Sequence, residues 1–389
     1  MHSTVTAPIS SRGAFLLSRW NGRLCHTAGT GDTPLATFVP TTDRTVFDAE
    51  RRFGPGLYVL SRFAWLRREG RDFALESPLG SSHVLLHHPS AVAMVNAFLV
   101  PVRAVGLGSS PEAEALLTIL ANSGAIVECD DSGRESEPAG SSQWEFHDLL
   151  FHARSRLGRH ANPYGGRLPQ PFSFAAHEES ADGIALFSPD IDKLMREDPP
   201  FAQVVETRRS VRACGTNAVT AHQLGEFLYR SARVRAEGNR PYPGAGGCYE
   251  LEIYVAIRQC EGLESGLYHY DPRNHRLRKI DEPTEHVAQL LEQARIATGG
   301  VVPPQILFVY AARMERLTAK YQSLAYALAL KDAGVLQQTM CLNAAAMGLA
   351  GCPLGGGDSD VFARASGRDY YRESSVGEFI LGSLAEAQT

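Results

Sequence analysis

The sequence predicts an α+β protein with more than one domain. In the second half, two apolar strand patterns over residues 251–257 and 305–312 and a long helical pattern over 322–350 indicate a domain in which strands pack against helices. The first 130 residues carry a different pattern of short strands and short helices, which indicates a second domain. A chain of 389 residues with 44% hydrophobic residues can bury two or three sizeable cores.

Residues 1–142 are expected to form the smaller domain. Short strands are predicted over 65–70, 71–78 and 83–89, followed by a helix over 89–100 and then a helix, a Ser-Gly stop and a strand over 111–129. This succession resembles the winged-helix-like α+β modules that hold leader peptides in ribosomal peptide pathways. Such modules add an extended peptide to a sheet edge, which requires backbone more than particular side chains. We expect a peptide-binding module here, with a structural or dimer-supporting domain as the alternative.

Residues 143–199 are expected to form a docking helix and an irregular linker arm. The stretch 130–143 is polar and rich in Ser and Gly, which is typical of a loop. Residues 144–163 have an apolar and a basic face at helical spacing. His147 and His152 are five residues apart and do not share a helix face, so the pattern favours a docking helix over a metal site.

Residues 208–212 offer donors for an anionic ligand. A flavin mononucleotide (FMN) presents a dianionic phosphate, a polyol chain and a flat ring, and guanidinium forks and a hydroxyl suit the first two. The candidate cofactor-binding residues in this stretch are Arg208, Arg209, Ser210 and Arg212. Taken alone, the stretch also fits a solvated basic helix start.

A glycine-rich turn precedes the strand predicted over 251–257. Glycines carry no side-chain carbon, so main-chain N–H groups at such a turn can reach the face of a planar ligand. This supplies what the flat ring of a flavin needs. The candidate residues of the turn are Gly244, Ala245, Gly246 and Gly247.

These motifs, with three others in the same order, resemble the nitroreductase superfamily and specifically its SagB-type peptide dehydrogenases. The others are GLYHYDP at 266–272, the pair Lys320-Tyr321, and the loop CPLGGGDSD at 352–360. The resemblance covers about residues 200–384 and implies, for a domain predicted over 200–389, a nitroreductase-like flavin fold with a central, mainly antiparallel sheet flanked by helices. It also implies an obligate homodimer with FMN at the subunit interface.

The resemblance implies catalytic roles for Lys320 and Tyr321. A lysine acts as a base only where burial or neighbouring positive charge lowers its pKa, and a tyrosine could instead take the proton while the lysine stabilises the phenolate. The sequence leaves both assignments open. Cys248 and Glu250 depart from the family pattern, in which apolar residues and proline are commoner, and this bears on substrate fit more than on flavin binding.

Placements around the flavin also follow from the resemblance. Arg208 and Ser210 are expected to hold the phosphate and ribityl chain, and Arg212 the pyrimidine edge or the phosphate. The loop after the long helix is expected to cover the ring, with two glycine amides near N5. Its residues are Pro353, Leu354, Gly355 and Gly356.

The resemblance implies an FMN-dependent dehydrogenase that converts thiazolines or oxazolines in a ribosomally made peptide to thiazoles or oxazoles. Dioxygen would reoxidise the flavin, and the partners would be the azoline-containing precursor peptide and a cyclodehydratase. Three alternatives stay open: an oxidase of carrier-bound azolines in a nonribosomal pathway, an NAD(P)H-dependent reductase, and a non-catalytic peptide-binding scaffold.

Composition excludes several other classes. A net charge of -5 and a pI near 6.2 give no general attraction to nucleic acid or to anionic membranes. The sequence lacks an apolar run long enough to span a membrane, so a cytoplasmic protein is expected. Its seven cysteines are scattered without a Cys-x-x-Cys pair, which argues against a zinc site and against a disulfide framework.

Overall fold

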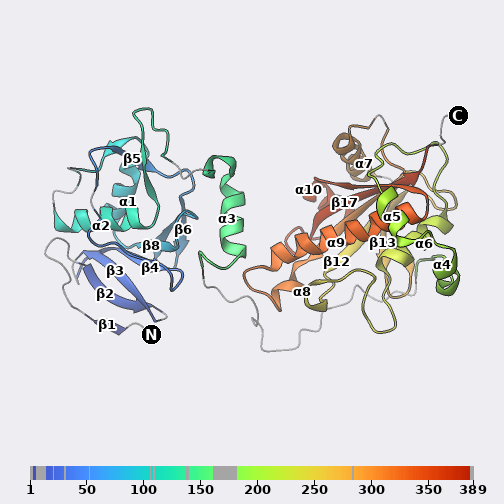
Figure 1. The fold of residues 1–389 in the computed structure, drawn as a ribbon, viewed down its shortest axis with the longest axis horizontal. Coiled ribbons are helices and arrows are strands. Elements are labelled where there is room, and N and C mark those ends of the chain that lie inside the picture. The colour runs from blue at the N-terminus through green and yellow to red at the C-terminus, as the bar shows by residue number, and fades with distance from the viewer. Residues whose placement is uncertain are drawn as a thin grey trace. The chain divides into compact units, whose positions relative to one another are not determined.

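The computed structural model describes residues 3–5, 15–20, 22–29, 32–51, 53–105, 107, 110–136, 140–160, 182–282, 284–300 and 302–385. The chain forms two compact units, Met1–Pro163 and Tyr164–Thr389 (Figure 1). The three-part division over 1–142, 143–199 and 200–389 stays a prediction.

The first unit contains two antiparallel sheets. The larger has the strand order β1 (Ser3–Val5), β2 (Phe15–Trp20), β3 (Arg23–Gly29), β4 (Pro34–Pro40), β8 (Ser82–Leu86), β7 (Asp72–Glu76) and β6 (Trp65–Glu69). The smaller has the order β10 (Ile126–Cys129), β5 (Leu57–Leu60) and β9 (Val102–Arg103). The strands predicted within 65–89 and 111–129 are confirmed, whereas β1 to β4 were not predicted.

In the described part of the first unit, three α-helices accompany these sheets: α1 (Pro89–Ala97), α2 (Pro111–Asn122) and α3 (Phe146–Ser155). Helix α2 begins where the Ser110 hydroxyl accepts a hydrogen bond from the Ala113 N–H, with proline at the first helical position. Its middle is buried in the core of the unit. Helix α3 is shorter than the predicted stretch of 144–163. An ion pair of 2.7 Å between Arg154 and Glu76 joins it to the rest of the first unit.

The second unit is built on a seven-stranded sheet in which every pair is antiparallel. Its order is β11 (Ile184–Ala185), β14 (Arg276–Asp281), β13 (Gly266–Asp271), β12 (Leu251–Ile257), β15 (Ile306–Arg313), β17 (Glu373–Ser383) and β16 (Leu349–Leu354). The predicted α+β class with a central antiparallel sheet is confirmed. The strands predicted at 251–257, 266–272 and 305–312 agree with β12, β13 and β15 within one residue.

Helices cover both faces of this sheet. Along β12, Leu251, Ile253 and Val255 belong to the core beneath α6 (Ala221–Ala232) and α9 (Ala325–Ala346). Tyr254 and Ala256 belong to the core beneath α7 (Glu285–Thr298) and α10 (Ser359–Ser366). Burial on both faces explains the unbroken apolar runs of the central strands. The unit also contains the short helices α4 (Ile191–Glu197), α5 (Phe201–Thr207), α8 (Met314–Thr318) and η2 (Ala245–Gly247), and η1 (Ser141–Gln143) lies in the first unit.

Helix α9 lies across the sheet of the second unit (Figure 1) and is shorter than the predicted 322–350. It ends because Gly348 adopts the left-handed conformation, with φ +64°, and turns the chain into β16. The helix begins at Ala325, so Lys320 and Tyr321 lie in the turn between α8 and α9. No helix within the described ranges combines the length and apolar character of a membrane span.

Candidate functional site

The arginine-rich segment 208–212 has no regular secondary structure and connects α5 to the chain that leads into α6. The Val211 N–H donates a hydrogen bond to the Gly351 carbonyl at 3.0 Å, which fixes the segment beside β16. Arg209 and Arg212 are exposed, and Arg208 and Ser210 are half-buried. Their donors therefore remain accessible to a ligand at this place.

Three of these side chains lie close to two buried thiols, those of Cys341 and Cys352. Burial raises the pKa of Cys341 on α9, and the Arg208 guanidinium beside it partly offsets that effect. Burial likewise raises the pKa of Cys352 on β16, with Arg212 and the Ser210 hydroxyl as the opposing groups. Two guanidiniums and one hydroxyl thus gather where the C-terminal half of α9 meets β16.

The glycine turn lies at the N-terminal half of the same helix. The Ala245 N–H donates a hydrogen bond of 2.7 Å to Oδ2 of Asp332, a buried residue of α9. Gly246 and Gly247 have φ values of +56° and +70°, which an L-residue with a side chain rarely adopts. Gly246 and Gly247 are exposed, so the turn presents backbone at the surface.

The Lys320-Tyr321 pair packs on this turn. Lys320 Nζ donates a hydrogen bond to the Gly246 carbonyl at 2.8 Å. A side-chain carbon on Gly246 would overlap the Tyr321 hydroxyl and would lie 2.6 Å from Lys320 Nζ. The fold therefore joins two motifs that are more than 70 residues apart in the sequence, and both functional groups of the pair lie next to the glycine turn.

The loop after β16 lines a cavity of about 290 Å³. Pro353 and Leu354 end the strand, and the glycines that follow are exposed and face α9 across this cavity. Ser375 to Glu378 of β17 form another wall. The lining comprises Tyr326, Leu330, Ala333, Gly334, Gln337, Leu354, Gly355, Gly356, Gly357, Ser359, Ser375, Val376, Gly377 and Glu378.

Helix α9 thus supports both ends of an elongated site. Asp332 holds the glycine turn and Cys341 lies beside Arg208, and nine residues of helix separate them by about 13 Å. One end offers guanidinium and hydroxyl groups, and the other offers glycine backbone at two loops. This donor set fits a flavin mononucleotide, with the phosphate at the arginine end and the ring at the glycine end.

Sequence reasoning did not assign a role to the carboxyl groups beneath the glycine turn. Glu250 is fully buried, and among the residues that the structure describes neither of its carboxyl oxygens has a hydrogen-bond partner. Burial raises its pKa to about 7, and the nearby Asp332 carboxyl adds to this effect. Burial also raises the pKa of Asp332, although the Ala245 N–H opposes the rise. Glu250 thus lies in the core below the turn, at one of the two positions where the sequence departs from the family pattern.

The Glu250→Gln substitution should make the second unit less sensitive to pH. The folded-state pKa of Glu250 is raised above its usual value near 4.5, so its contribution to stability is fully present below pH 4.5 and is lost as the pH rises through 7. We expect the free energy of unfolding of the wild type to fall by about 1 to 3 kcal/mol from pH 5 to pH 8, and that of the variant to fall less.

Denaturant titrations at the two pH values measure this effect. The three tryptophans, Trp20, Trp65 and Trp144, all lie in the first unit. A transition seen by circular dichroism but not by tryptophan fluorescence therefore belongs to the second unit. An equal pH dependence of that transition in wild type and variant would contradict the assignment.

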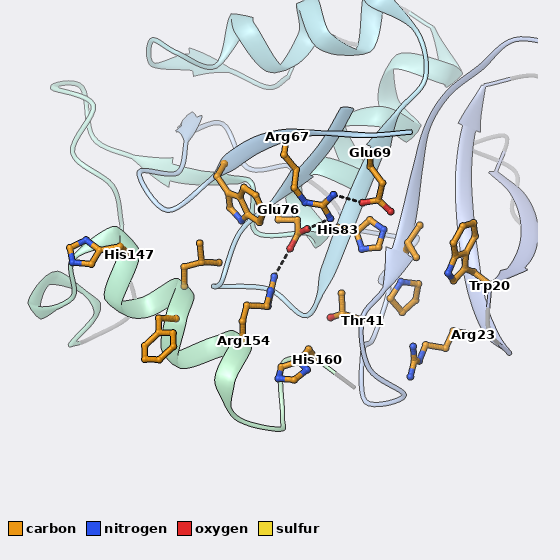
Figure 2. Close-up of a pocket in the computed structure, with 15 residues that line it drawn as sticks. Trp20, Arg23, Thr41, Arg67, Glu69, Glu76, His83, His147, Arg154 and His160 are labelled. Carbon is orange, nitrogen blue, oxygen red and sulfur yellow. Dashed lines mark hydrogen bonds and ion pairs between the residues drawn. The ribbon is translucent and has the colours of Figure 1, made fainter. Parts of the chain in front are cut away.

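The first unit has a pocket of its own, of about 680 Å³ (Figure 2). At its centre, buried Glu76 bridges Arg67 and Arg154 at 2.8 and 2.7 Å. Burial favours the neutral carboxyl, but the two guanidiniums prevail and hold the pKa of Glu76 below its usual range. Trp20 and Trp65 supply aromatic surface around this ion-pair network. The pocket offers both apolar and hydrogen-bonding surface to a ligand.

His147 and His152 lie on α3, and His147 lines this pocket. Within the described ranges, no group of three His, Cys, Asp or Glu side chains has the arrangement of a metal site. Cys248 is half-buried next to the glycine turn; burial raises its pKa, and Lys320 is the first opposing charge.

Both parts of the chain are similar to known protein families. Residues 58–161 match the family model of the cyanobactin oxidase ThcOx, and residues 205–382 match the model of the nitroreductase family. The protein "Putative nitroreductase MJ1384" of Methanocaldococcus jannaschii is 33% identical over 178 residues, which are 45% of this chain and 85% of that protein.

Two further relatives are named as processing proteins. Trifolitoxin-processing protein TfxB of Rhizobium leguminosarum bv. trifolii is 26% identical over 140 residues, 35% of this chain and 35% of that protein. Microcin B17-processing protein McbC of Escherichia coli is 26% identical over 151 residues, 36% of this chain and 53% of that protein. The matches span only part of these two proteins. The resemblance drawn from the sequence motifs is confirmed, and the chain belongs to the nitroreductase family.

Proposed function

We propose that this protein is an FMN-dependent dehydrogenase that oxidises azolines in a ribosomally made peptide to azoles. The observation that carries the proposal is the contact of Lys320 and Tyr321 with Gly246, because it places two proton-handling groups against the glycine turn of a flavin-type site. The matches to a cyanobactin oxidase model and to two processing proteins support a peptide substrate.

The chemistry requires a base next to the ring-binding backbone. An azoline becomes an azole by losing a proton from Cα and a hydride from Cβ, and FMN supplies the two-electron acceptor when it is bound. Lys320 is exposed, and its Nζ donates a hydrogen bond to the Gly246 carbonyl. The Tyr321 hydroxyl approaches the same glycine. In this arrangement Tyr321, as the phenolate that the neighbouring Lys320 stabilises, would accept the Cα proton and become neutral tyrosine.

Each predicted cofactor residue has a role in the proposal. Arg208, Ser210 and Arg212 hold the phosphate and polyol, and exposed Arg209 adds positive charge at that end. The turn of Gly244, Ala245, Gly246 and Gly247 and the loop of Pro353, Leu354, Gly355 and Gly356 hold the ring through main-chain groups.

We also propose that the active form is a homodimer with its flavin sites at the subunit interface. Helix α9 presents three large apolar side chains to solvent beside the cavity: Tyr326, Leu330 and Val335 are 49%, 38% and 36% exposed. An apolar surface of this kind is typical of an interface. A second copy would cover it and would enclose the cavity, excluding water from the reacting ring.

The first unit would bind the precursor peptide. Its pocket combines tryptophan surface with a buried carboxylate paired to two guanidiniums, which suits recognition of a peptide segment (Figure 2). This role supports cooperation with a cyclodehydratase that installs the azolines. The alternatives of a carrier-bound substrate or a scaffold without catalysis require no such combination of peptide pocket and flavin-type site.

Anaerobic mixing tests the proposal against the reductase alternative. The FMN-loaded protein should lose its yellow colour within seconds to minutes on addition of an azoline-bearing peptide, because no dioxygen is present to reoxidise the flavin. NAD(P)H should bleach it far more slowly. Fast bleaching by NAD(P)H with none by the peptide would instead identify a reductase.

A further inference from the structure

A buried glutamate lies in the wall of the cavity next to the proposed ring site. Glu378 is on β17, only 7% of its surface is exposed, and it lines the cavity with the loop glycines and α9. Its main-chain carbonyl accepts a hydrogen bond from Gln337 Nε2 at 3.1 Å. Among the described parts of the chain, its carboxyl group has no hydrogen-bond or ion-pair partner. Its oxygens keep some exposure to the cavity, so a ligand that enters there would take the place of solvent beside the carboxyl group.

Gly357 makes room for this carboxyl group. A side-chain carbon on Gly357 would overlap the Glu378 carboxyl, with Oε2 only 2.6 Å away. A side-chain carbon on Gly355 or Gly356 would instead lie in open space. The glutamate is thus packed directly beneath the loop whose preceding glycines are proposed to hold the flavin ring.

The charged groups around Glu378 do not neutralise it. The Tyr310 hydroxyl on β15 donates its hydrogen bond to Met340 Sδ instead. The Asp358 side chain is engaged as the N-cap of α10. Asp360 follows on α10, and Lys331 and Asp332 lie on α9. Burial alone raises the pKa of Glu378 to about 7, and neither neighbouring acids nor Lys331 contribute to that value.

We propose that Glu378 couples ligand binding in this cavity to the uptake of one proton, and that its neutral carboxyl group then donates a hydrogen bond to the ring edge of the bound cofactor. This inference rests on the proposed function, because FMN is the ligand. Two physical effects drive the uptake. A ring that enters the cavity displaces water and desolvates the carboxylate further. The edge of the ring also offers more acceptors than donors, which favours the protonated acid as its partner.

Titration calorimetry of the apoprotein with FMN tests this directly. At pH 8 the phosphate of free FMN is fully ionised, so it contributes no proton change. The same titration in two buffers of different ionisation enthalpy gives the number of protons bound. We expect the wild type to take up between about 0.5 and 1 proton per FMN, and its affinity to fall up to about tenfold per pH unit above pH 8.

Two variants assign the proton. Glu378→Gln keeps the size and the hydrogen-bonding capacity of the side chain but cannot titrate, and it should bind FMN with no proton uptake and with a flat pH dependence. Glu250→Gln is the matched control, because Glu250 is also a buried glutamate with a pKa raised to about 7 but does not line the cavity. It should retain the uptake.

Several outcomes would overturn the inference. Absence of proton uptake by the wild type would refute it whether or not the variants fold. Uptake that persists in Glu378→Gln, or that disappears only in Glu250→Gln, would assign the proton elsewhere. Tight FMN binding with any of these results leaves the proposed function intact, whereas no FMN binding at all would refute both.

Discussion

Lys320→Ala should abolish azoline oxidation while the protein remains yellow. Removal of Nζ leaves the Tyr321 hydroxyl without the neighbouring positive charge that stabilises its phenolate, and loss of one group in proton transfer typically lowers the rate by about 10² to 10⁴-fold. The lost hydrogen bond to Gly246 is solvent-exposed, so stability should change by less than about 1 kcal/mol.

Single-turnover bleaching of FMN-loaded protein by an azoline peptide is the appropriate measurement, because it separates chemistry from binding. Tyr321→Phe should show a similar loss if Tyr321 takes the proton. Lys193→Ala is the control, since Lys193 is an exposed lysine on α4 and pairs only loosely with Glu197, at 3.8 Å. An undiminished rate in Lys320→Ala would remove Lys320 from the mechanism.

Gly246→Ala should impair both FMN binding and turnover. The new side-chain carbon would meet the Tyr321 hydroxyl and Lys320 Nζ, so the pair must move away from the turn. A displacement of about 1 Å in a catalytic group can lower the rate by about 10²-fold. The left-handed backbone of an alanine here adds a cost of about 1 kcal/mol.

Gly247→Ala separates the backbone strain from the clash. Gly247 has a φ of +70°, close to that of Gly246, but a side-chain carbon there has no atom within 4 Å among the described residues. The two variants should lose similar stability in thermal unfolding, whereas Gly246→Ala should lose far more activity. Equal activity in both variants would show that the contact of Gly246 with Lys320 and Tyr321 is not needed for activity.

The central strands of the second unit were predictable because burial on both faces leaves unbroken apolar runs. The end of α9 was overpredicted because the apolar pattern of the helix continues through Gly348 into β16 without a break in composition. The contact between Gly246 and Lys320 follows from strand order, which composition does not specify.

Two of the buried glutamates of the second unit are only weakly indicated by the sequence. Glu250 and Glu378 are single acidic residues beside or within the apolar sequence of a strand. Such a pattern indicates either a strand at the edge of a sheet or a buried titratable group. Only the three-dimensional structure distinguishes these, since it shows both side chains to be buried and places Glu378 under Gly357.

The mass of an azoline-bearing peptide after aerobic incubation with FMN-loaded protein tests the central claim most directly. Oxidation to the azole removes two hydrogen atoms, so we predict a loss of about 2 Da per ring with an equal yield of hydrogen peroxide. An unchanged mass, with the flavin bound and the peptide shown to bind the protein, would contradict the assignment as an azoline dehydrogenase.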